Sequence, residues 1–432
     1  MHLLDKCSMQ LVFHNPAFSF QLLRIIGQTY YGGADIGECL STAYQIKEGD
    51  IESWYNEWLK TANRVYGYAE DCMSKGHQVS ARDAYIRATN YYQNGAAFYL
   101  DTNPSDSRIT STWEKGVESF RKAIRLFPNK VEIIEIPYDG TTLPGYFFNA
   151  ADEKYNGNGN NSNSQTQVSD KEKPTLILTT GLDGSQEELY FLGVAAALER
   201  GYNCLTFEGP GQGTVVRKQK LHFRADWEKV VSSVIDFALS SSKKQEEVID
   251  PQRIALIGYS MGGYLVPRAA AFEDRIAACI ADDGVISLYD AWIDQLQSIR
   301  QDIENGNEAV VNAVVNTIMN FDIGTKWKIT HSMSVFGAHS PLELIRKLKE
   351  YSMYDIAHLI KCPTLILAGE KDRSFAGQSE KLYDLLKCPK KYILFTSEEG
   401  AEDHCHIAAL SLANQRIFDW LDDVIMLQKQ GS

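Results

Sequence analysis

A serine stands in a sharp turn between a predicted strand and a predicted helix, and this turn limits the fold more than any other feature. Residues 258–262 read Gly-Tyr-Ser-Met-Gly, after the apolar run 254–257 and before the small-residue stretch 263–272. Such a turn strains the serine backbone and brings neighbouring chain so close that side chains in place of the glycines would clash. The pattern predicts a strand, a nucleophile-bearing turn and a helix, with Ser260 as the nucleophile.

Two more residues follow predicted strands in an order that supports this interpretation, which matters because the pentapeptide alone arises by chance in roughly one such chain in ten. Asp372 comes just after the buried run 363–369, and His404 follows the strand predicted at 392–395. The order serine, acid, histidine, each after a strand, is that of the α/β-hydrolase arrangement. The histidine would take and return the serine proton, and Asp372 would hold the imidazole in the required tautomer.

Neighbouring residues compete for the same roles. His406 is a second candidate base, but we expect it to begin the helix predicted at 407–420, whereas His404 comes first after the preceding turn. The weaker alternatives to Asp372 as the acid are Asp355, Glu370 and Asp403.

An oxyanion hole needs two backbone N–H groups aimed at the developing negative charge. The N–H of Met261 directly follows the nucleophile, and the second should come from the loop after the strand at 175–180. We expect it to be that of Leu182, with Asp183 as the alternative. The residues that we expect to contact the substrate are Asp183, Tyr259 and Asp283.

Two segments resemble a metal-binding or a cofactor-binding motif, but neither has the spacing or the residues that such a motif requires. Residues 403–406 read Asp-His-Cys-His, but one contiguous run cannot easily surround a tetrahedral ion, so we expect no metal. Residues 208–213 resemble a dinucleotide-binding loop, yet Thr214 stands where the third glycine should be and Pro210 lacks a phosphate-facing N–H. We expect no cofactor.

Apolar runs of strand length recur after residue 130, with helical patterns between most of them. This alternation predicts an α/β fold, a mostly parallel twisted sheet with helices on both faces. The first two strands, with Asp-Gly between them, indicate a hairpin. The predicted strands are 131–137, 143–148, 175–180, 203–207, 254–257, 276–281, 364–368 and 392–395.

The other segments complete the predicted domain organisation. Residues 1–130 show helical spacing of apolar residues, which predicts a helical cap domain before a catalytic α/β-hydrolase domain at 131–432. Residues 284–355 interrupt the alternation and predict a helical lid over the site. The stretch 152–173, rich in Asn, Ser and Gly, predicts an exposed mobile loop.

Two groups of side chains in the helical segments could line a pocket, although each type more often has another role. Aromatic residues more often pack in a helical core. Those in the N-terminal segment are Tyr30, Tyr31, Trp54, Trp58, Tyr91, Tyr92, Phe98 and Tyr99. Polar residues near the lid are more often capping or surface residues. They are Asp283, Asp290, His331 and His339.

Composition argues against several partners and points to a small-molecule substrate. The 432 residues carry a formal charge of −13 with no basic cluster, which argues against a nucleic acid or an anionic membrane as partner. No apolar run approaches the roughly 20 residues of a membrane span, and the start lacks a signal-peptide pattern, so we expect a cytoplasmic protein. The eight cysteines, scattered without metal spacing, indicate reduced thiols.

Several motifs resemble those of the serine hydrolases grouped with 2,6-dihydroxypseudooxynicotine hydrolase, a carbon–carbon bond hydrolase, and the related hydrolases of fungal secondary-metabolite clusters. The similar segments are 32–38, 76–85, 209–213, 258–262, 335–337 and 400–405. The resemblance extends over nearly the whole chain. It implies that Ser260, Asp372 and His404 form a triad, that the helical segment is a cap, that the substrate is a ketone or polyketide-like acyl compound, and that the protein is a homodimer.

These observations predict a serine hydrolase that forms an acyl-enzyme and cleaves a carbon–carbon, ester or lactone bond. A cyclase or lyase using the same triad, a non-hydrolytic ligand-binding protein and a peptidase stay open as alternatives. A capped pocket disfavours the peptidase, because an extended chain would not fit in it.

Overall fold

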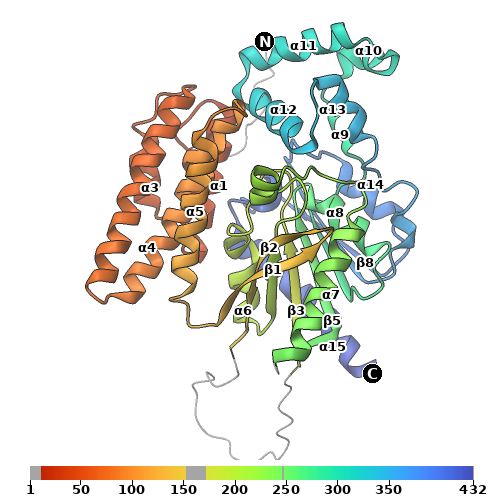
Figure 1. Ribbon diagram of the computed structural model, residues 1–432. Coiled ribbons are helices and arrows are strands. Elements are labelled where there is room, and N and C mark those ends of the chain that lie inside the picture. Colours follow the sequence, from red (N-terminus) through yellow and green to blue (C-terminus); the bar gives the residue numbers. More distant parts are fainter. Residues whose placement is uncertain (1–10, 152–171, 246–247, 432) are drawn as a thin grey trace, which may run out of the picture.

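The computed structural model describes residues 11–151, 172–245 and 248–431 and is built around one eight-stranded sheet (Figure 1). The strand order is β1-β2-β4-β3-β5-β6-β7-β8. The strands are β1 (Val131–Tyr138), β2 (Thr141–Phe148), β3 (Glu172–Thr179), β4 (Asn203–Phe207), β5 (Val248–Tyr259), β6 (Ala278–Asp282), β7 (Thr364–Gly369) and β8 (Lys390–Phe395). The predicted α/β fold and its eight strands are confirmed, although several strand ends differ from the prediction.

Strand direction determines where the site lies. The hairpin of β1 and β2 is antiparallel and joins β4 in antiparallel pairing, whereas β4, β3, β5, β6, β7 and β8 pair in parallel. The carboxyl ends of parallel strands meet at one edge of a sheet, where such folds bind their ligands. The turns after β3, β5, β6 and β7 therefore come together.

Helices cover both faces of the sheet. On one face of the sheet, strand residues pack with α7 and α8 in one hydrophobic cluster. On the opposite face, strand residues pack with α6 and α15 in a second cluster. Buried strand residues such as Leu256 and Ile257 alternate between the two clusters, as the two-residue period of a strand requires. The flanking helices are α6 (Ala195–Glu199), α7 (Glu228–Gln245), α8 (Gly262–Ala270), α14 (Gln378–Leu385) and α15 (Leu410–Gly431).

The N-terminal helices stand beside the sheet (Figure 1, red to orange) and enclose a third hydrophobic cluster. Asn15, Asp35 and Asp50 cap the first three helices by accepting hydrogen bonds from backbone N–H groups of the first turn. The main helices are α1 (Pro16–Gly27), α2 (Ile36–Ala43), α3 (Ile51–Ser74), α4 (Gln78–Asn90) and α5 (Arg108–Ile124), with the short turns η2 (Tyr91–Ala97) and η3 (Phe98–Thr102) between the last two.

Five α-helices lie between β6 and β7, and α10 to α13 lie above the sheet in Figure 1 (cyan to blue). They are α9 (Leu288–Ile293), α10 (Arg300–Asn305), α11 (Glu308–Phe321), α12 (Ile323–Phe336) and α13 (Pro341–Leu348). On this arrangement we propose the division into a cap at 1–130 and a catalytic domain at 131–432, with 284–355 as the lid.

Two predictions from the sequence, the mobile loop and the absence of a membrane span, can be compared with the described residues. The mobile loop predicted at 152–173 lies outside the described residues, except that Glu172 and Lys173 belong to β3 and pair with Val248 and Ile249. The prediction was wrong for those two residues, because pairing with β5 outweighs their polar character. Among the helices of the described chain, none combines the length and the apolar character needed to cross a bilayer.

Candidate active site

The turn around Ser260 has the geometry of a nucleophile elbow. Strand β5 ends at Tyr259, helix α8 begins at Gly262, and Ser260 between them has a left-handed φ of 60°. A Cβ on Gly258 would lie 2.3 Å from the Gly262 carbonyl oxygen, so only glycine fits there. The backbone strain is therefore localised at the predicted nucleophile.

His404 faces this serine from the turn after β8. Its Nε2 lies 2.8 Å from Ser260 Oγ, which is hydrogen-bond distance. Burial by itself would lower the pKa of His404, but the Cys405 sulfur and the Asp372 and Asp283 carboxylates beside the ring hold that pKa well above the usual range of histidine. The neighbouring negative groups thus favour a proton on the imidazole.

Two carboxylates, not one, contact the other ring nitrogen of His404. Its Nδ1 lies 2.8 Å from Oδ2 of Asp283 and 3.2 Å from Oδ2 of Asp372. Burial and the neighbouring Asp372 raise the pKa of Asp283 to about 6. Burial also acts to raise the pKa of Asp372, but the charge of His404 outweighs it and that pKa is lowered. Asp283 is therefore the member of the pair that more readily holds a proton.

The position of Asp283 differs from the sequence expectation. We expected a substrate contact, but Asp283 is not among the described residues that line the cavity, and its carboxylate lies beneath His404 with 1% exposure. Its Oδ2 also accepts a hydrogen bond from the Cys405 N–H at 3.0 Å. Pairing of β6 between β5 and β7 brings Asp283 between the turns that carry Ser260 and Asp372.

The alternative base and acids lie elsewhere. His406 is fully buried, with Nε2 3.2 Å from Asp282 Oδ1 and its ring stacked on Phe395. Glu370 accepts hydrogen bonds from Ser397, and Asp355 is exposed. Asp403 lines the cavity, and burial together with the nearby Glu402 raises its pKa to about 6.

The loop after β3 touches the elbow where an oxyanion hole would form. A Cβ on Gly181 would lie 2.6 Å from the Met261 nitrogen, so glycine permits this approach. Leu182 and Asp183 both line the cavity. The Leu182 carbonyl oxygen, which can only accept, lies 3.1 Å from Nε2 of His331, and Nδ1 of that ring lies 2.9 Å from Asp101.

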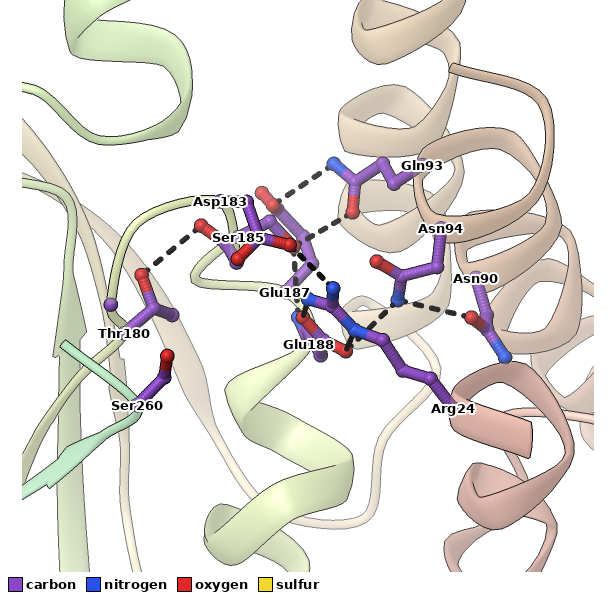
Figure 2. Close-up of polar contacts among 12 residues, drawn as sticks. Arg24, Asn90, Gln93, Asn94, Thr180, Asp183, Ser185, Glu187, Glu188 and Ser260 are labelled. Carbon is purple, nitrogen blue, oxygen red and sulfur yellow. Dashed lines mark hydrogen bonds and ion pairs between the residues drawn. The ribbon is translucent and has the colours of Figure 1, made fainter. Parts of the chain in front are cut away.

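Arg24 of the N-terminal helix α1 holds this loop from the other side (Figure 2). Its guanidinium binds Glu188 through two hydrogen bonds of 2.7 and 2.6 Å and reaches Asp183 Oδ2 at 2.5 Å. Bidentate pairing of this kind fixes direction as well as distance. Gln28 and Asn94 also donate to Glu188, at 2.9 and 3.1 Å.

A second set of contacts joins η2 to the same loop (Figure 2). Ser185 donates to Gln93 at 2.9 Å and accepts from the Glu188 N–H at 3.0 Å. The Gln93 amide donates to Glu187 at 3.1 Å, and the Tyr146 hydroxyl donates to the same carboxylate at 2.8 Å. Polar side chains of the helical segment thus form hydrogen bonds with polar groups of a loop that borders the elbow.

A cavity of about 530 Å³ lies above Ser260 and His404, between the N-terminal helices, the lid helices and the strand ends. This size suits a small organic molecule. Its lining includes Phe20, Gln21, Arg24, Phe98 and Tyr99 from the N-terminal helices, and Trp292, Gln295, Trp327, Lys328, Ser332 and Phe336 from the lid.

Some aromatic residues of the N-terminal segment line the cavity, and others pack in the core of the helical segment. Phe98 and Tyr99 line the cavity, whereas Trp54, Trp58 and the Tyr91 ring pack in the cluster of the helical segment. Core packing therefore accounts for most of these side chains, as the sequence analysis favoured. The pair that reaches the site belongs to η3, which lies against α12.

Of the other residues predicted to contact the substrate or to lie near the lid, some border the cavity and others make contacts elsewhere. Tyr259 borders the cavity, but its ring packs in the core and its hydroxyl lies close to Gly193. Asp290 accepts a hydrogen bond from Tyr354, and the His339 backbone N–H donates to Glu343. The sequence patterns did not indicate Arg24 or Lys328, because no local motif marks a single cation on a helix.

Comparisons with known proteins agree with this architecture. Residues 176–384 match the model of the alpha/beta hydrolase family. The chain is 34% identical to "Hydrolase LUC6" of Fusarium sp, over 98% of this chain and 99% of that protein. It is 35% identical to "20-hydroxy-prefusarin hydrolase FUS2" of Gibberella moniliformis (strain M3125 / FGSC 7600), over 98% of this chain and 99% of that protein.

A solved structure has the same fold over nearly the full length. The crystal structure of 2,6-dihydroxy-pseudo-oxynicotine hydrolase superposes with a TM-score of 0.68 at 24% identity, covering 93% of this chain and 95% of that one. These matches confirm the resemblance found in the sequence. The chain is a hydrolase and belongs to the alpha/beta hydrolase family.

Proposed function

We propose that this hydrolase cleaves a bond beside a carbonyl group of a small organic substrate through an acyl-enzyme on Ser260. The observation that carries the proposal is the 2.8 Å contact between Ser260 Oγ and His404 Nε2 at the base of the cavity, with Ser260 on a left-handed turn. A serine alone is a poor nucleophile near neutral pH, and an imidazole at this distance can remove its proton during attack.

The proposed steps use residues around this contact. His404 takes the Ser260 proton as Oγ attacks the carbonyl carbon, and Asp372 stabilises the imidazolium that forms. Backbone N–H groups of Met261 and Leu182 bind the oxyanion. His404 then returns the proton to the leaving group, and a water that it activates releases the acyl group.

The leaving group decides the reaction class. We propose a ketone or polyketide-like substrate cleaved at a carbon–carbon bond, or an ester or lactone, in fungal secondary metabolism. The names of two similar proteins support a small oxygenated substrate, since one is a hydrolase of 20-hydroxy-prefusarin and one of 2,6-dihydroxy-pseudo-oxynicotine. The aromatic lining at Phe98, Trp292 and Trp327 would suit a planar unsaturated molecule.

The first test is labelling of the purified protein with a fluorophosphonate probe, read by intact mass. Wild type should gain one probe mass, whereas Ser260→Ala and His404→Ala should remain unlabelled. His406→Gln is the matched control, because His406 is a buried histidine that contacts Asp282 instead of Ser260. Folded wild type that does not react would refute the proposal.

A second test separates hydrolysis from cyclisation or elimination with the same triad. Turnover of a substrate in ¹⁸O-labelled water should place solvent oxygen in the acid product. A product without solvent oxygen would favour a cyclase or lyase. The homodimer and the cytoplasmic location remain predictions, which light scattering and cell fractionation would check.

A further inference from the structure

The lid contributes a lysine to the cavity beside two other lid residues. Lys328 on α12 lines the same cavity as Ser260 and His404. Its Nζ lies 3.1 Å from Gln295 Oε1 and 4.9 Å from the centre of the Trp292 ring. Gln295 and Trp292 also line the cavity. The three side chains therefore form one continuous part of its wall.

The orientation of Gln295 is determined by its other contacts. Its amide nitrogen donates to the Ala291 carbonyl at 3.2 Å and the Arg373 carbonyl at 3.4 Å. A carbonyl can only accept, so the oxygen of the amide must be the atom that faces Lys328. Lys328 thus has one fixed acceptor for its three N–H donors and an aromatic face beside it.

Two of the other cations that line the cavity are already paired. Arg24 forms ion pairs with Asp183 and Glu188. Lys371, which is half-buried, lies 3.4 Å from Glu402. Within residues 11–151, 172–245 and 248–431, by contrast, no carboxylate lies at ion-pair distance from Lys328.

Removing an ammonium group from water costs free energy when no carboxylate pairs with it. Burial accordingly lowers the pKa of Lys328 to about 8, although Asp372 acts to raise it. At neutral pH the amine is still mainly protonated. A negatively charged ligand atom in the cavity would supply the missing partner.

We propose that Lys328, held by Gln295 and Trp292, binds an anionic oxygen of the substrate. This inference rests on the proposed function, because it takes the cavity above Ser260 as the substrate site. It narrows the substrate class to acyl compounds that carry a carboxylate or an acidic enol oxygen. A phenolate or enolate has the same recognition chemistry, namely a negatively charged oxygen that accepts N–H donors.

The test compares binding of matched charged and neutral ligands by isothermal titration calorimetry. For the carboxylate the pair is 4-phenylbutanoate and 4-phenylbutanamide. For the enolate the pair is 5-phenylcyclohexane-1,3-dione, which is ionised at neutral pH, and its neutral enol methyl ether. Wild type should prefer one anion by about tenfold or more over its neutral partner, as expected for a charge-assisted hydrogen bond.

The variants assign this preference to one side chain. Lys328→Met keeps the length of the side chain but removes the charge, and it should abolish the preference. Lys328→Arg should retain part of it, which guards against a loss caused by misfolding. Lys326→Met is the matched control, since Lys326 lies on the same helix and is not among the described residues that line the cavity. It should bind as wild type does.

Each outcome decides the proposal. Preference for the carboxylate or for the enolate identifies which anion the site accepts, and its loss in Lys328→Met supports the proposal. Equal binding of both partners in both pairs, or a preference that survives in Lys328→Met, overturns it. Fluorophosphonate labelling of each variant is measured in parallel. Labelling of Lys328→Met would show that the serine chemistry is intact, and an unlabelled wild type would refute the proposed function separately.

Discussion

The loop after β3 and the lid helix α12 both border the cavity, but contacts of different kinds hold them. Charged hydrogen bonds from Arg24 to Asp183 and Glu188 fix the loop. The lid helix contacts η3 through the Trp327 ring, which stacks on Phe98 at 4.3 Å, and through single polar contacts of Trp327 and His331. Bidentate charged pairing fixes a position more narrowly than ring stacking with single polar contacts does.

This difference matches what each region would have to do. An oxyanion donor loses its effect when it is displaced by a fraction of an ångström, so the loop benefits from rigid support. A lid that contacts the variable part of a substrate can tolerate adjustment. Under the proposed function, the proposed cap would support the chemistry through α1 and the choice of substrate through its contact with α12.

The largest effect is expected from the two carboxylates at His404, because they contact the proposed base directly. The double variant Asp283→Asn with Asp372→Asn should slow fluorophosphonate labelling by about 10⁴-fold, the size seen when a triad acid is lost. Each single variant should lose less, because one carboxylate remains within 3.2 Å of Nδ1. Asp403→Asn is the control, because Asp403 is a buried carboxylate that lines the cavity instead of contacting Nδ1 of His404. If Asp372→Asn alone matched the double variant, Asp283 would have no part.

Arg24→Met should reduce the labelling rate by about 10- to 100-fold, because it frees the loop that carries the proposed oxyanion donor. The matched control is Arg87→Met, which removes a similar ion pair with Glu38 inside the helical segment and leaves the loop bonds in place. Arg24→Lys, which keeps the charge, should have an intermediate rate. Circular dichroism would establish that each variant is folded. Equal rates for Arg24→Met and Arg87→Met would contradict a role of Arg24 in positioning the loop.

The pH dependence of labelling tests the electrostatics of the same region. Attack needs neutral His404, whose pKa is raised by its surroundings, so the rate should rise with pH through an inflection above the usual value of about 6.5. Removing a carboxylate destabilises the imidazolium and should move the inflection to lower pH in Asp372→Asn, by about one pH unit. An inflection that does not move would show that Asp372 does not act on His404.

Local patterns were enough to predict the sheet and the order of Ser260, Asp372 and His404. Glycines at a tight turn and buried apolar runs act over a few residues, so a sequence displays them directly. The contact of Asp283 with His404 depends on which strands become neighbours, and that information is not local. The bond from Arg24 to Asp183 joins residues 159 positions apart. Nothing around Arg24 in the sequence distinguishes it from an ordinary surface arginine of a helix.

The smallest effect is expected from Trp327→Phe, which tests the adaptable side of the comparison. This change keeps an aromatic ring against Phe98 but removes the hydrogen bond from Trp327 Nε1 to the Phe98 carbonyl, which measures 2.9 Å. A neutral hydrogen bond contributes about 1 kcal/mol, which corresponds to a decrease of about 1–3 °C in Tm for a large chain. The labelling rate should stay within about twofold of wild type, because the loop bonds to Arg24 are untouched. A rate loss as large as that of Arg24→Met would mean that the lid also positions the catalytic groups, through the contact of His331 with the Leu182 carbonyl.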